Sequence, residues 1–401
     1  MFRDVYRGKQ VLITGHTGFK GSWLALWLRE LGANIIGYSL DPPTNPNHFD
    51  LLASSQVLTF SSSQLPNFIS IFGDIRDVKK LNQTFQNYKP DIVFHLAAQP
   101  LVRYSYKHPL DTFETNVIGT INVLEACRQT ESVRAVVNIT SDKCYENKEW
   151  VWGYRESDPF GGYDPYSASK SCAELVTNCY RRSFFITETE KLRRCEGESK
   201  AEGLTTSQLL NFTTSVLLAS ARAGNVIGGG DWAADRLIPD IMRAVSRNKK
   251  VVIRNPKSTR PWQHVLEPLS GYLALGQKLL EGKSEFADGW NFGPDDESNI
   301  CVEEVAEKMT SFWHKIGYQR KPFKHPSLRP SDPHEAGLLK LDCSKAHSRL
   351  EWKPVWDIKK TLVMTAQWYK EFYERDGIMS QKDLDEYILN AKEKGLRWAV
   401  D

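Results

Sequence analysis

A glycine-rich loop between an apolar strand and a helix constrains this chain more than any other feature. The apolar run 11–14 leads directly into Gly15-x-x-Gly18-x-x-Gly21, and a helix-like stretch follows at 22–28. Glycines permit a tight turn and close backbone approach, and a helix N-terminus offers amide donors to a pyrophosphate. The pattern predicts a phosphate cradle made of Gly15, Thr17, Gly18, Phe19, Lys20 and Gly21. Lys20 and the neighbouring His16 either contact a phosphate or cofactor or face the solvent.

Apolar strands alternate with amphipathic helices over the first two hundred residues. The candidate strands are 10–14, 34–38, 69–72, 91–95 and 134–140, and the candidate helices are 20–31, 77–87, 111–128 and 166–184. This alternation predicts an α/β fold of the Rossmann type, with a doubly wound parallel sheet covered on both faces. Ligands of such sheets bind outside the carboxyl ends of the strands. The glycine loop and the segments 95–99 and 140–143 should therefore converge on one crevice.

A change in amino-acid composition divides the chain into two predicted domains. A dinucleotide-binding domain covers 1–222, with a polar, aperiodic insertion at 187–212. Residues 223–401 are richer in Pro, Trp and Arg and form a smaller substrate-binding domain, partly interleaved with the first. Trp23 and Trp27, four residues apart on the first helix, are predicted to pack in the core.

Composition excludes several classes of function. The chain of 401 residues has 52 Lys and Arg against 49 Asp and Glu, a net charge of +3 that favours neither nucleic acid nor a membrane surface. No signal-like segment or bilayer-spanning apolar run is present, and the seven cysteines are scattered without a C-x-x-C pair. We expect a cytoplasmic protein with reduced thiols and no metal centre.

A second motif, Tyr166-x-x-x-Lys170, points to chemistry. A spacing of four residues places both side chains on one helical face, and a nearby cation favours a phenolate below its usual pKa of about 10. A surface hydrogen bond would explain the pair alone. With the glycine loop upstream and Ser141 at an intervening strand end, a catalytic set is the better interpretation.

This combination resembles the extended branch of the short-chain dehydrogenase/reductase superfamily, whose members act on nucleotide sugars. The resemblance implies that Ser141 donates to the substrate oxygen, that Tyr166 is the acid/base, and that Lys170 assists it and bonds the nicotinamide ribose. It also implies cofactor contacts from Asp74, Ile75, Leu96, Ala97 and Ala98.

Asp142 and Lys143 follow Ser141 and add an acid and a base beside the reaction centre. Once C4 of a sugar is a ketone, the C5 proton becomes acidic and water can leave from C6, which requires one base and one acid. We assign Lys143 as the base and Asp142 as the acid. A buried site moves the pKa of each group in the required direction. Without a catalytic role, the same two residues would be a solvated Asp-Lys pair that caps a strand.

Longer segments resemble the family of CDP-glucose 4,6-dehydratases. They are 15–21, 97–103, 140–156, 162–167, 222–232 and 260–268. The resemblance implies CDP-glucose as substrate, a 4-keto-6-deoxy sugar as product, and nucleotide-sugar contacts from Gln99, Arg103, Asn225, Arg260 and Asn291. The alternatives are that Asn225 is a turn residue and that Arg260 forms a surface ion pair. Three other functions also fit the pattern: a UDP-sugar 4,6-dehydratase, a nucleotide-sugar 4-epimerase, and a catalytically silent protein that only binds a dinucleotide.

The end of the second strand decides between two cofactors. NAD-binding folds usually present an acidic residue there for the ribose hydroxyl, and here Ser39 or Asp41 must serve. No arginine follows to bind a 2′-phosphate, so the prediction is NAD. The resemblance also implies a homo-oligomer paired through helices 111–128 and 166–184. Core burial explains their apolar residues Val117, Ile121 and Leu124 equally well.

Overall fold

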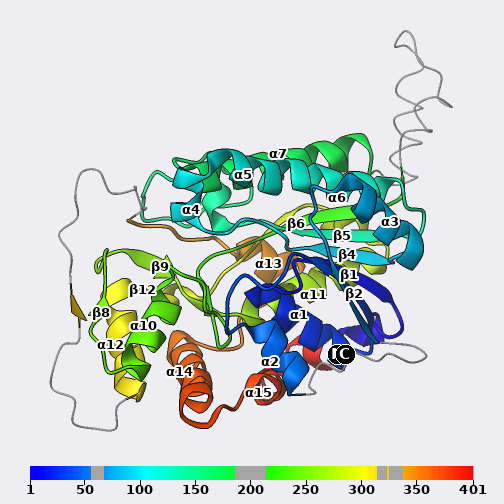
Figure 1. The fold of residues 1–401 in the computed structure, drawn as a ribbon. Coiled ribbons are helices and arrows are strands. Elements are labelled where there is room, and N and C mark those ends of the chain that lie inside the picture. The colour runs from blue at the N-terminus through cyan, green and yellow to red at the C-terminus, as the bar shows by residue number, and fades with distance from the viewer. Residues whose placement is uncertain (56–66, 186–213, 314–322, 325–336, 401) are drawn as a thin grey trace, which may run out of the picture.

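A seven-stranded parallel sheet runs through the computed structural model, which describes residues 1–55, 67–185, 214–313, 323–324 and 337–400 (Figure 1). The strands are β1 (Gln10–Thr14), β2 (Asn34–Ser39), β3 (Phe68–Phe72), β4 (Ile92–His95), β5 (Ala135–Ile139), β6 (Leu217–Ala223) and β11 (Gly289–Phe292). Their order across the sheet is β3-β2-β1-β4-β5-β6-β11. The chain reverses its direction of winding between β1 and β4, which creates a crevice at their carboxyl ends. The predicted Rossmann-type fold is confirmed.

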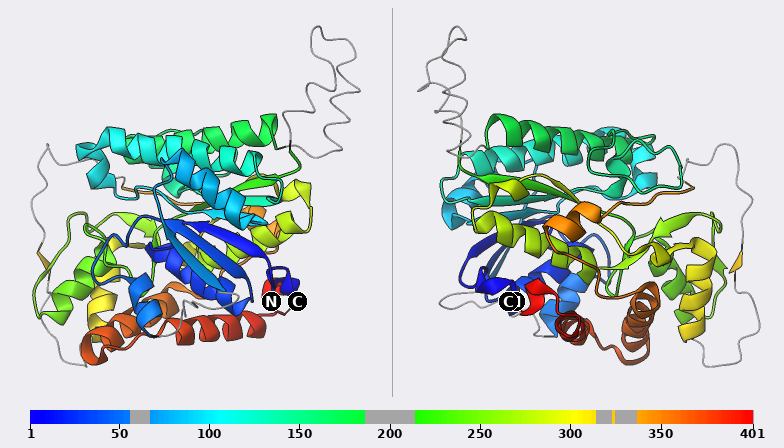
Figure 2. Two further views of the ribbon diagram at one scale, coloured as in Figure 1. Left: turned by 45° about the vertical axis from the view of Figure 1, so that its right-hand side comes forward. Right: turned by 180° about the vertical axis from the view of Figure 1, so that it is seen from behind.

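Helices cover both faces of the sheet (Figures 1 and 2). One face carries α3 (Val78–Tyr88), α4 (Val102–Lys107), α5 (Pro109–Phe113), α6 (Gly119–Arg128) and α7 (Pro165–Ser183). The other face carries α1 (Phe19–Glu30) and α11 (Leu266–Leu280). Their apolar sides, together with the strands, bury two large hydrophobic clusters.

The helix predicted at 111–128 is interrupted in the structure. A π-helical turn, Glu114–Ile118, separates α5 from α6. This turn directs Asn116 between two elements: its amide donates to Ser169 Oγ of α7 at 2.8 Å and to the Gln99 carbonyl at 3.1 Å. Such turns arise where local hydrogen bonds outweigh helical regularity.

Residues after 225 build a side lobe, which we define as α10 (Leu237–Ser246), α12 (Val302–Trp313), β8 (Val251–Val252), β9 (Thr259–Pro261) and β12 (Asn299–Cys301). It lies to the left of the seven-stranded sheet in Figure 1. The remaining described strands and α-helices are β7 (Val226–Ile227), β10 (Gln263–His264), β13 (Phe323–Lys324), α2 (His48–Ser54), α13 (Ser344–Arg349), α14 (Ile358–Arg375), α15 (Ser380–Glu393) and α16 (Arg397–Val400).

The two halves of the chain share one sheet. The predicted division at residue 222 falls inside β6, while β11 and α11 come from the second half and complete the sheet and its cover. The predicted insertion at 187–212 lies outside the described residues.

Trp23 and Trp27 pack in the core, as predicted, with no exposed surface. Leu124 is also buried, whereas Val117 and Ile121 are half-buried, so pairing of subunits through these helices stays a prediction. Among the described residues, six cysteines are free thiols, and no helix has the length and apolar character needed to cross a bilayer.

Glu267 on α11 holds the C-terminal segment against the sheet cover. Its fully buried carboxylate accepts hydrogen bonds from the Val355 and Trp356 amides at 2.9 and 2.7 Å and from the Tyr387 hydroxyl at 2.7 Å. These bonds satisfy a buried carboxylate but do not remove the cost of its charge. Burial raises the pKa of Glu267 to about 7.

This carboxyl group should give folding a pH dependence. Because its pKa rises from 4.5 to about 7 on folding, its contribution is fully present below the lower value and lost as pH rises through about 7. Between about pH 4.5 and about pH 8, we expect the free energy of unfolding to fall by up to about 3 kcal/mol more in the wild type than in Glu267→Gln. Urea titrations measure this difference. Parallel pH profiles would contradict it.

Candidate active site

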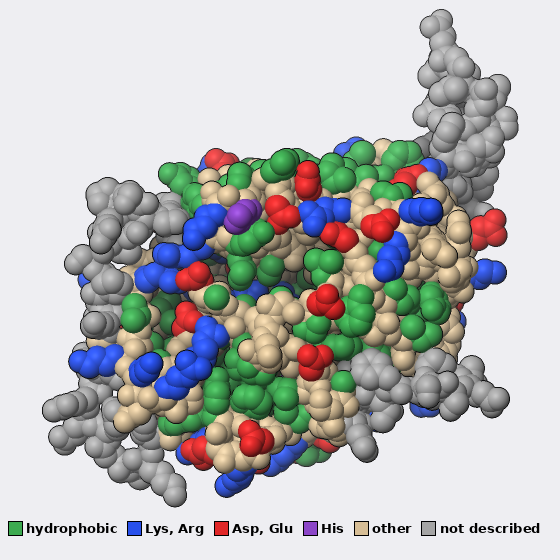
Figure 3. Space-filling view, viewed as in Figure 1, with side chains coloured by type: hydrophobic (Ala, Val, Ile, Leu, Met, Phe, Trp, Pro, Cys, Tyr) green, Lys and Arg blue, Asp and Glu red, His purple; other side chains and the backbone are tan. Residues whose placement is uncertain are grey.

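A cavity of about 940 Å³ opens at the carboxyl ends of the sheet strands. Its walls come from the loops after β1 to β6 and from the side lobe. Figure 3 shows a hollow near the centre of this face, with Lys and Arg side chains gathered beside it. The convergence of these loops follows directly from the parallel topology.

The glycine loop forms a tight cradle at one end of the cavity. Gly15 has φ +77°, and a Cβ there would lie 2.8 Å from the Ala97 amide nitrogen. A Cβ at Gly21 would lie 2.1 Å from the Gly15 carbonyl oxygen. Gly18 then precedes α1, whose first-turn amides face this loop. Glycine at 15 and 21 lets the backbone pack this closely in front of the helix N-terminus, so the residues present fit the pyrophosphate of a dinucleotide.

Neighbouring strand ends carry the other predicted cofactor contacts. The Ser39 hydroxyl lies 2.8 Å from Thr17 Oγ1, and both residues line the cavity, as does Asp41. Asp74 lines it too, held by Arg76 Nη2 at 2.7 Å, and the side-chain and backbone hydrogen bonds from Arg76 lower the pKa of Asp74 despite burial. Ile75, Leu96, Ala97 and Ala98 complete this wall.

Ser141, Tyr166 and Lys170 meet in the middle of the cavity. Ser141 follows β5, while Tyr166 and Lys170 lie one turn apart on α7, which Asp164 caps by accepting from the Ser167 amide. The Ser141 side chain hydrogen bonds to Tyr166. All three residues are buried.

Burial controls the charge of this group. It raises the pKa of Tyr166 to about 12, although the Ser141 hydrogen bond and the charge of Arg236 act in the opposite direction. It also lowers the pKa of Lys170 to about 8, with Glu174 opposing. The sequence-based expectation that the pKa of Tyr166 lies below its usual value is therefore wrong in direction, because desolvation outweighs the effects that lower it.

Asp142 and Lys143 line the same cavity. Asp142 is 4% exposed; its Oδ1 accepts from the Ser141 hydroxyl at 2.9 Å, while its Oδ2 is buried without a hydrogen bond. Burial raises the pKa of Asp142, against the charges of Lys143, Arg260 and Lys20. A carboxyl group that keeps its proton above its usual range can act as an acid.

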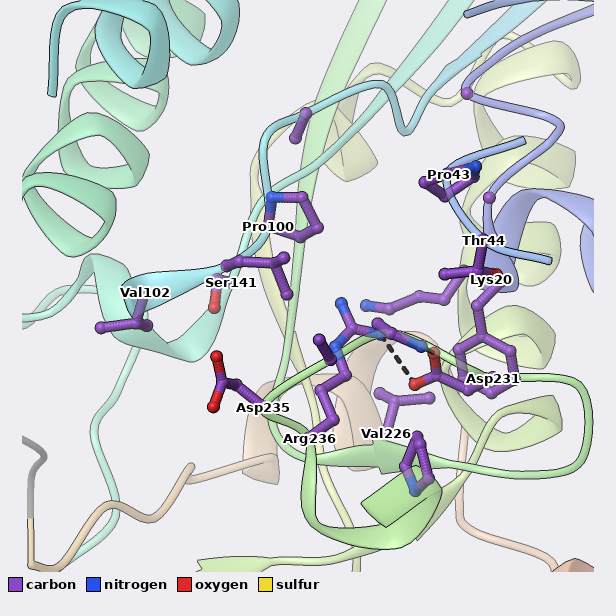
Figure 4. Close-up of a pocket in the computed structure, with 18 of the residues that line it drawn as sticks. Lys20, Pro43, Thr44, Pro100, Val102, Ser141, Val226, Asp231, Asp235 and Arg236 are labelled. Carbon is purple, nitrogen blue, oxygen red and sulfur yellow. Dashed lines mark hydrogen bonds and ion pairs between the residues drawn. The ribbon is translucent and has the colours of Figure 1, made fainter. Parts of the chain in front are cut away.

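Arg236 is a cavity residue that the sequence pattern did not reveal. It pairs with Asp231 at 2.8 Å, and Figure 4 shows Lys20 and Arg236 extending toward one another across the cavity. Burial, together with the charges of Lys170 and Arg236, lowers the pKa of Lys20 to about 8. The available signal was an arginine directly before the helix-like run 237–246, beyond the segments that carry the resemblance. The cluster of cations suits a diphosphate.

Three of the five predicted substrate contacts line the cavity, namely Arg103, Asn225 and Arg260. The other two, Gln99 and Asn291, do not line the cavity. Gln99 uses its side chain on Thr112 and the Leu101 amide. Asn291 has no exposed surface and is fully bonded, donating to the Tyr154 and Asp342 carbonyls and accepting from Tyr145.

Packing keeps His16, Trp150 and Trp152 away from the cavity wall. His16 is buried, so it does not face the solvent, and its Nε2 lies 2.7 Å from Ser70 Oγ. Trp150 stacks on Tyr154 with ring centres 5.3 Å apart, and Trp152 is 69% exposed; neither lines the cavity. Within the described residues, no cluster of three or more metal-ligating side chains is found.

The fold and the Ser141, Tyr166 and Lys170 group define a nucleotide-binding enzyme of the short-chain dehydrogenase/reductase class. Residues 12–235 match the family model described as GDP-mannose 4,6 dehydratase. The chain is 47% identical over 389 residues to the CDP-glucose 4,6-dehydratase of Salmonella typhimurium, covering 96% of this chain and 98% of that protein. The chain belongs to the GDP-mannose 4,6 dehydratase family.

More distant relatives show the same architecture. The chain is 30% identical to UDP-glucuronate 4-epimerase 1 of Arabidopsis thaliana, covering 91% of this chain and 78% of that protein. The crystal structure of dTDP-glucose 4,6-dehydratase from Bacillus anthracis in complex with NAD matches with a TM-score of 0.69 and 19% identity. That match covers 92% of this chain and 98% of the other, and shows the shared fold.

The glycine cradle generates a direct test. Gly21→Ala places a methyl group against the Gly15 carbonyl, whereas at Gly18 the nearest atom would lie 3.3 Å away. We expect Gly21→Ala to weaken NAD binding at least about tenfold and Gly18→Ala to have a smaller effect. Isothermal titration calorimetry gives both Kd values. An equal loss in the two variants would contradict the steric argument.

Proposed function

We propose that this enzyme is an NAD-dependent CDP-glucose 4,6-dehydratase, which forms CDP-4-keto-6-deoxyglucose. The observation that carries the reaction type is Asp142, a buried carboxyl group with a raised pKa, beside Ser141 and Lys143 in the cavity of Tyr166. The nucleotide assignment rests on the 47% identity to a CDP-glucose 4,6-dehydratase along nearly the whole chain.

The residues that would hold NAD run from the glycine cradle to α7. The cradle would bind the pyrophosphate, Ser39 and Asp41 the adenosine ribose, Asp74 the adenine and Lys170 the nicotinamide ribose. No basic residue occurs in 39–47, which favours NAD over a cofactor with a 2′-phosphate. When bound, NAD supplies an acceptor for the C4 hydrogen and returns it to C6.

The first step is removal of the proton from the C4 hydroxyl. Tyr166 accepts this proton, and Ser141 orients the sugar oxygen by hydrogen bonding. Burial holds Tyr166 in its protonated form, so the Ser141 hydrogen bond and the positive charge of Arg236 are needed to favour the phenolate.

The second step is loss of water across C5 and C6. Lys143 takes the C5 proton, made acidic by the C4 ketone, and Asp142 gives its proton to the departing C6 oxygen. When the hydrogen from C4 is delivered to C6, Lys143 gives its proton back to C5. The proton that Tyr166 took from the C4 hydroxyl balances the one that Asp142 lost. Both side chains come from one short turn, Asp142–Cys144, and both residues line the cavity. Arg260, together with Asn225, would bind the nucleotide diphosphate.

A panel of nucleotide sugars tests the proposed function. The protein is incubated with NAD and, separately, CDP-glucose, UDP-glucose, dTDP-glucose, GDP-mannose or UDP-N-acetylglucosamine, and the products are identified by mass spectrometry. Loss of one water from CDP-glucose alone is expected. Water loss from another sugar would overturn the nucleotide assignment. Unchanged masses would overturn the dehydratase, and chromatography would then separate an epimerase from a silent dinucleotide-binding protein.

The two chemical steps should separate by mutation. Tyr166→Phe removes the acid/base group, so C4 oxidation should slow by about 10²–10⁴-fold. Lys143→Ala leaves that group intact, so it should still oxidise C4 while water loss stalls. Absorbance of the reduced cofactor follows the first step, and mass spectrometry follows the second. Full dehydratase activity of Lys143→Ala would remove Lys143 from the mechanism.

A further inference from the structure

A buried ion pair lies directly beneath the catalytic loop, which we define as residues 140–145. The side chains of Glu174 on α7 and Arg222 on β6 are 2% and 4% exposed. Arg222 Nε donates to Glu174 Oε1 and Nη2 donates to Oε2, each at 2.8 Å. This paired geometry compensates two charges that have been removed from water. Neither residue lines the cavity.

Glu174 holds the first residue of the catalytic loop. The Thr140 hydroxyl donates to Glu174 Oε1, and the Ser220 hydroxyl donates to Oε2 at 2.8 Å. Glu174 stands one helical turn after Lys170 and two turns after Tyr166 on α7. Its carboxylate therefore fixes the start of the loop relative to the helix that carries the oxidation chemistry.

Arg222 holds the last residue of the same loop. Its Nη1 donates to the Tyr145 hydroxyl at 2.6 Å, and its guanidinium carbon lies 5.2 Å from the centre of the Tyr145 ring. The Tyr145 hydroxyl in turn donates to Asn291 Oδ1 of β11 at 2.7 Å. Tyr145 is buried, so the end of the loop is fixed to two strands of the sheet.

We propose that the Glu174–Arg222 pair is a clamp that sets the position of Asp142 and Lys143 relative to Tyr166. Each charged partner fixes one end of the loop, and the bidentate pair couples the two ends. Glu174 and Arg222 are thus positioning residues for water elimination. The effect on water elimination rests on the proposed function, whereas the contacts that form the clamp do not depend on it.

Tyr145→Phe is the variant that opens the clamp at one end. It removes the hydroxyl that accepts from Arg222 and donates to Asn291, and it leaves the ion pair intact, so no buried charge loses its ion-pair partner. Tyr6→Phe is the matched control. It also removes one buried tyrosine hydroxyl, which donates to the Leu273 carbonyl at 2.6 Å, outside the cavity.

Cys144 reports on the loop without any substrate. Its thiol is fully buried between the two clamped ends. We expect iodoacetamide to label Cys144 about tenfold faster in Tyr145→Phe than in the wild type, because local opening exposes the thiol. Peptide mass mapping separates this thiol from the other cysteines. Tyr6→Phe should label at the wild-type rate.

Kinetics of the same variants test the effect on the reaction. In single-turnover assays with CDP-glucose, Tyr145→Phe should slow water loss about tenfold and C4 oxidation less than about threefold, since Glu174 still holds Thr140. Equal slowing of both steps, or Cys144 labelling no faster than in Tyr6→Phe, would overturn the clamp. A wild type that releases no water from CDP-glucose would instead overturn the proposed function, and the labelling result would still decide the clamp.

Discussion

Desolvation at the carboxyl ends of the sheet is the constraint on which the site depends. It raises the pKa of Asp142 and of Tyr166 and lowers the pKa of Lys20 and Lys170 to about 8. Each shift favours the uncharged form, as expected where water is replaced by protein. A carboxyl group with a raised pKa, such as Asp142, can hold the proton that a departing oxygen needs. The topology creates this environment by bringing the loops after β1 to β6 together around one enclosed space.

A second buried carboxyl group, Glu174, is paired with Arg222 and keeps its charge. Glu174 and Arg222 are buried to about the same extent as Asp142, yet the pKa of Glu174 is lowered, because bidentate pairing with Arg222 and two hydroxyl donors outweigh desolvation. Asp142 has one hydroxyl donor and one oxygen without a partner. The difference in hydrogen bonding, rather than in depth, separates a fixed carboxylate from one that can hold a proton.

The sequence was sufficient for the sheet and the centre of the site, because both depend on local patterns. Strand alternation, the glycine spacing and Tyr166-x-x-x-Lys170 each span a few residues, and parallel topology brings them together. Asn291 and Gln99 do not line the cavity, because they bond to partners, Asp342 and Thr112 among them, that are not evident from sequence neighbours. Arg236 was missed because its cavity position depends on how the side lobe packs. The direction of the Tyr166 pKa shift depends on burial, which a motif does not contain.

The site divides its two chemical tasks between two kinds of element. Tyr166 and Lys170 stand on α7, a helix of 19 residues, whereas Asp142 and Lys143 stand on a short turn. A turn can change sequence without disturbing the sheet, while a helix residue is fixed by its neighbours on both sides. In the proposed mechanism, oxidation at C4 can therefore stay constant while the residues after Ser141 decide whether water is lost. A turn that carries two proton-transfer groups needs external support at both ends, and the proposed clamp supplies that support.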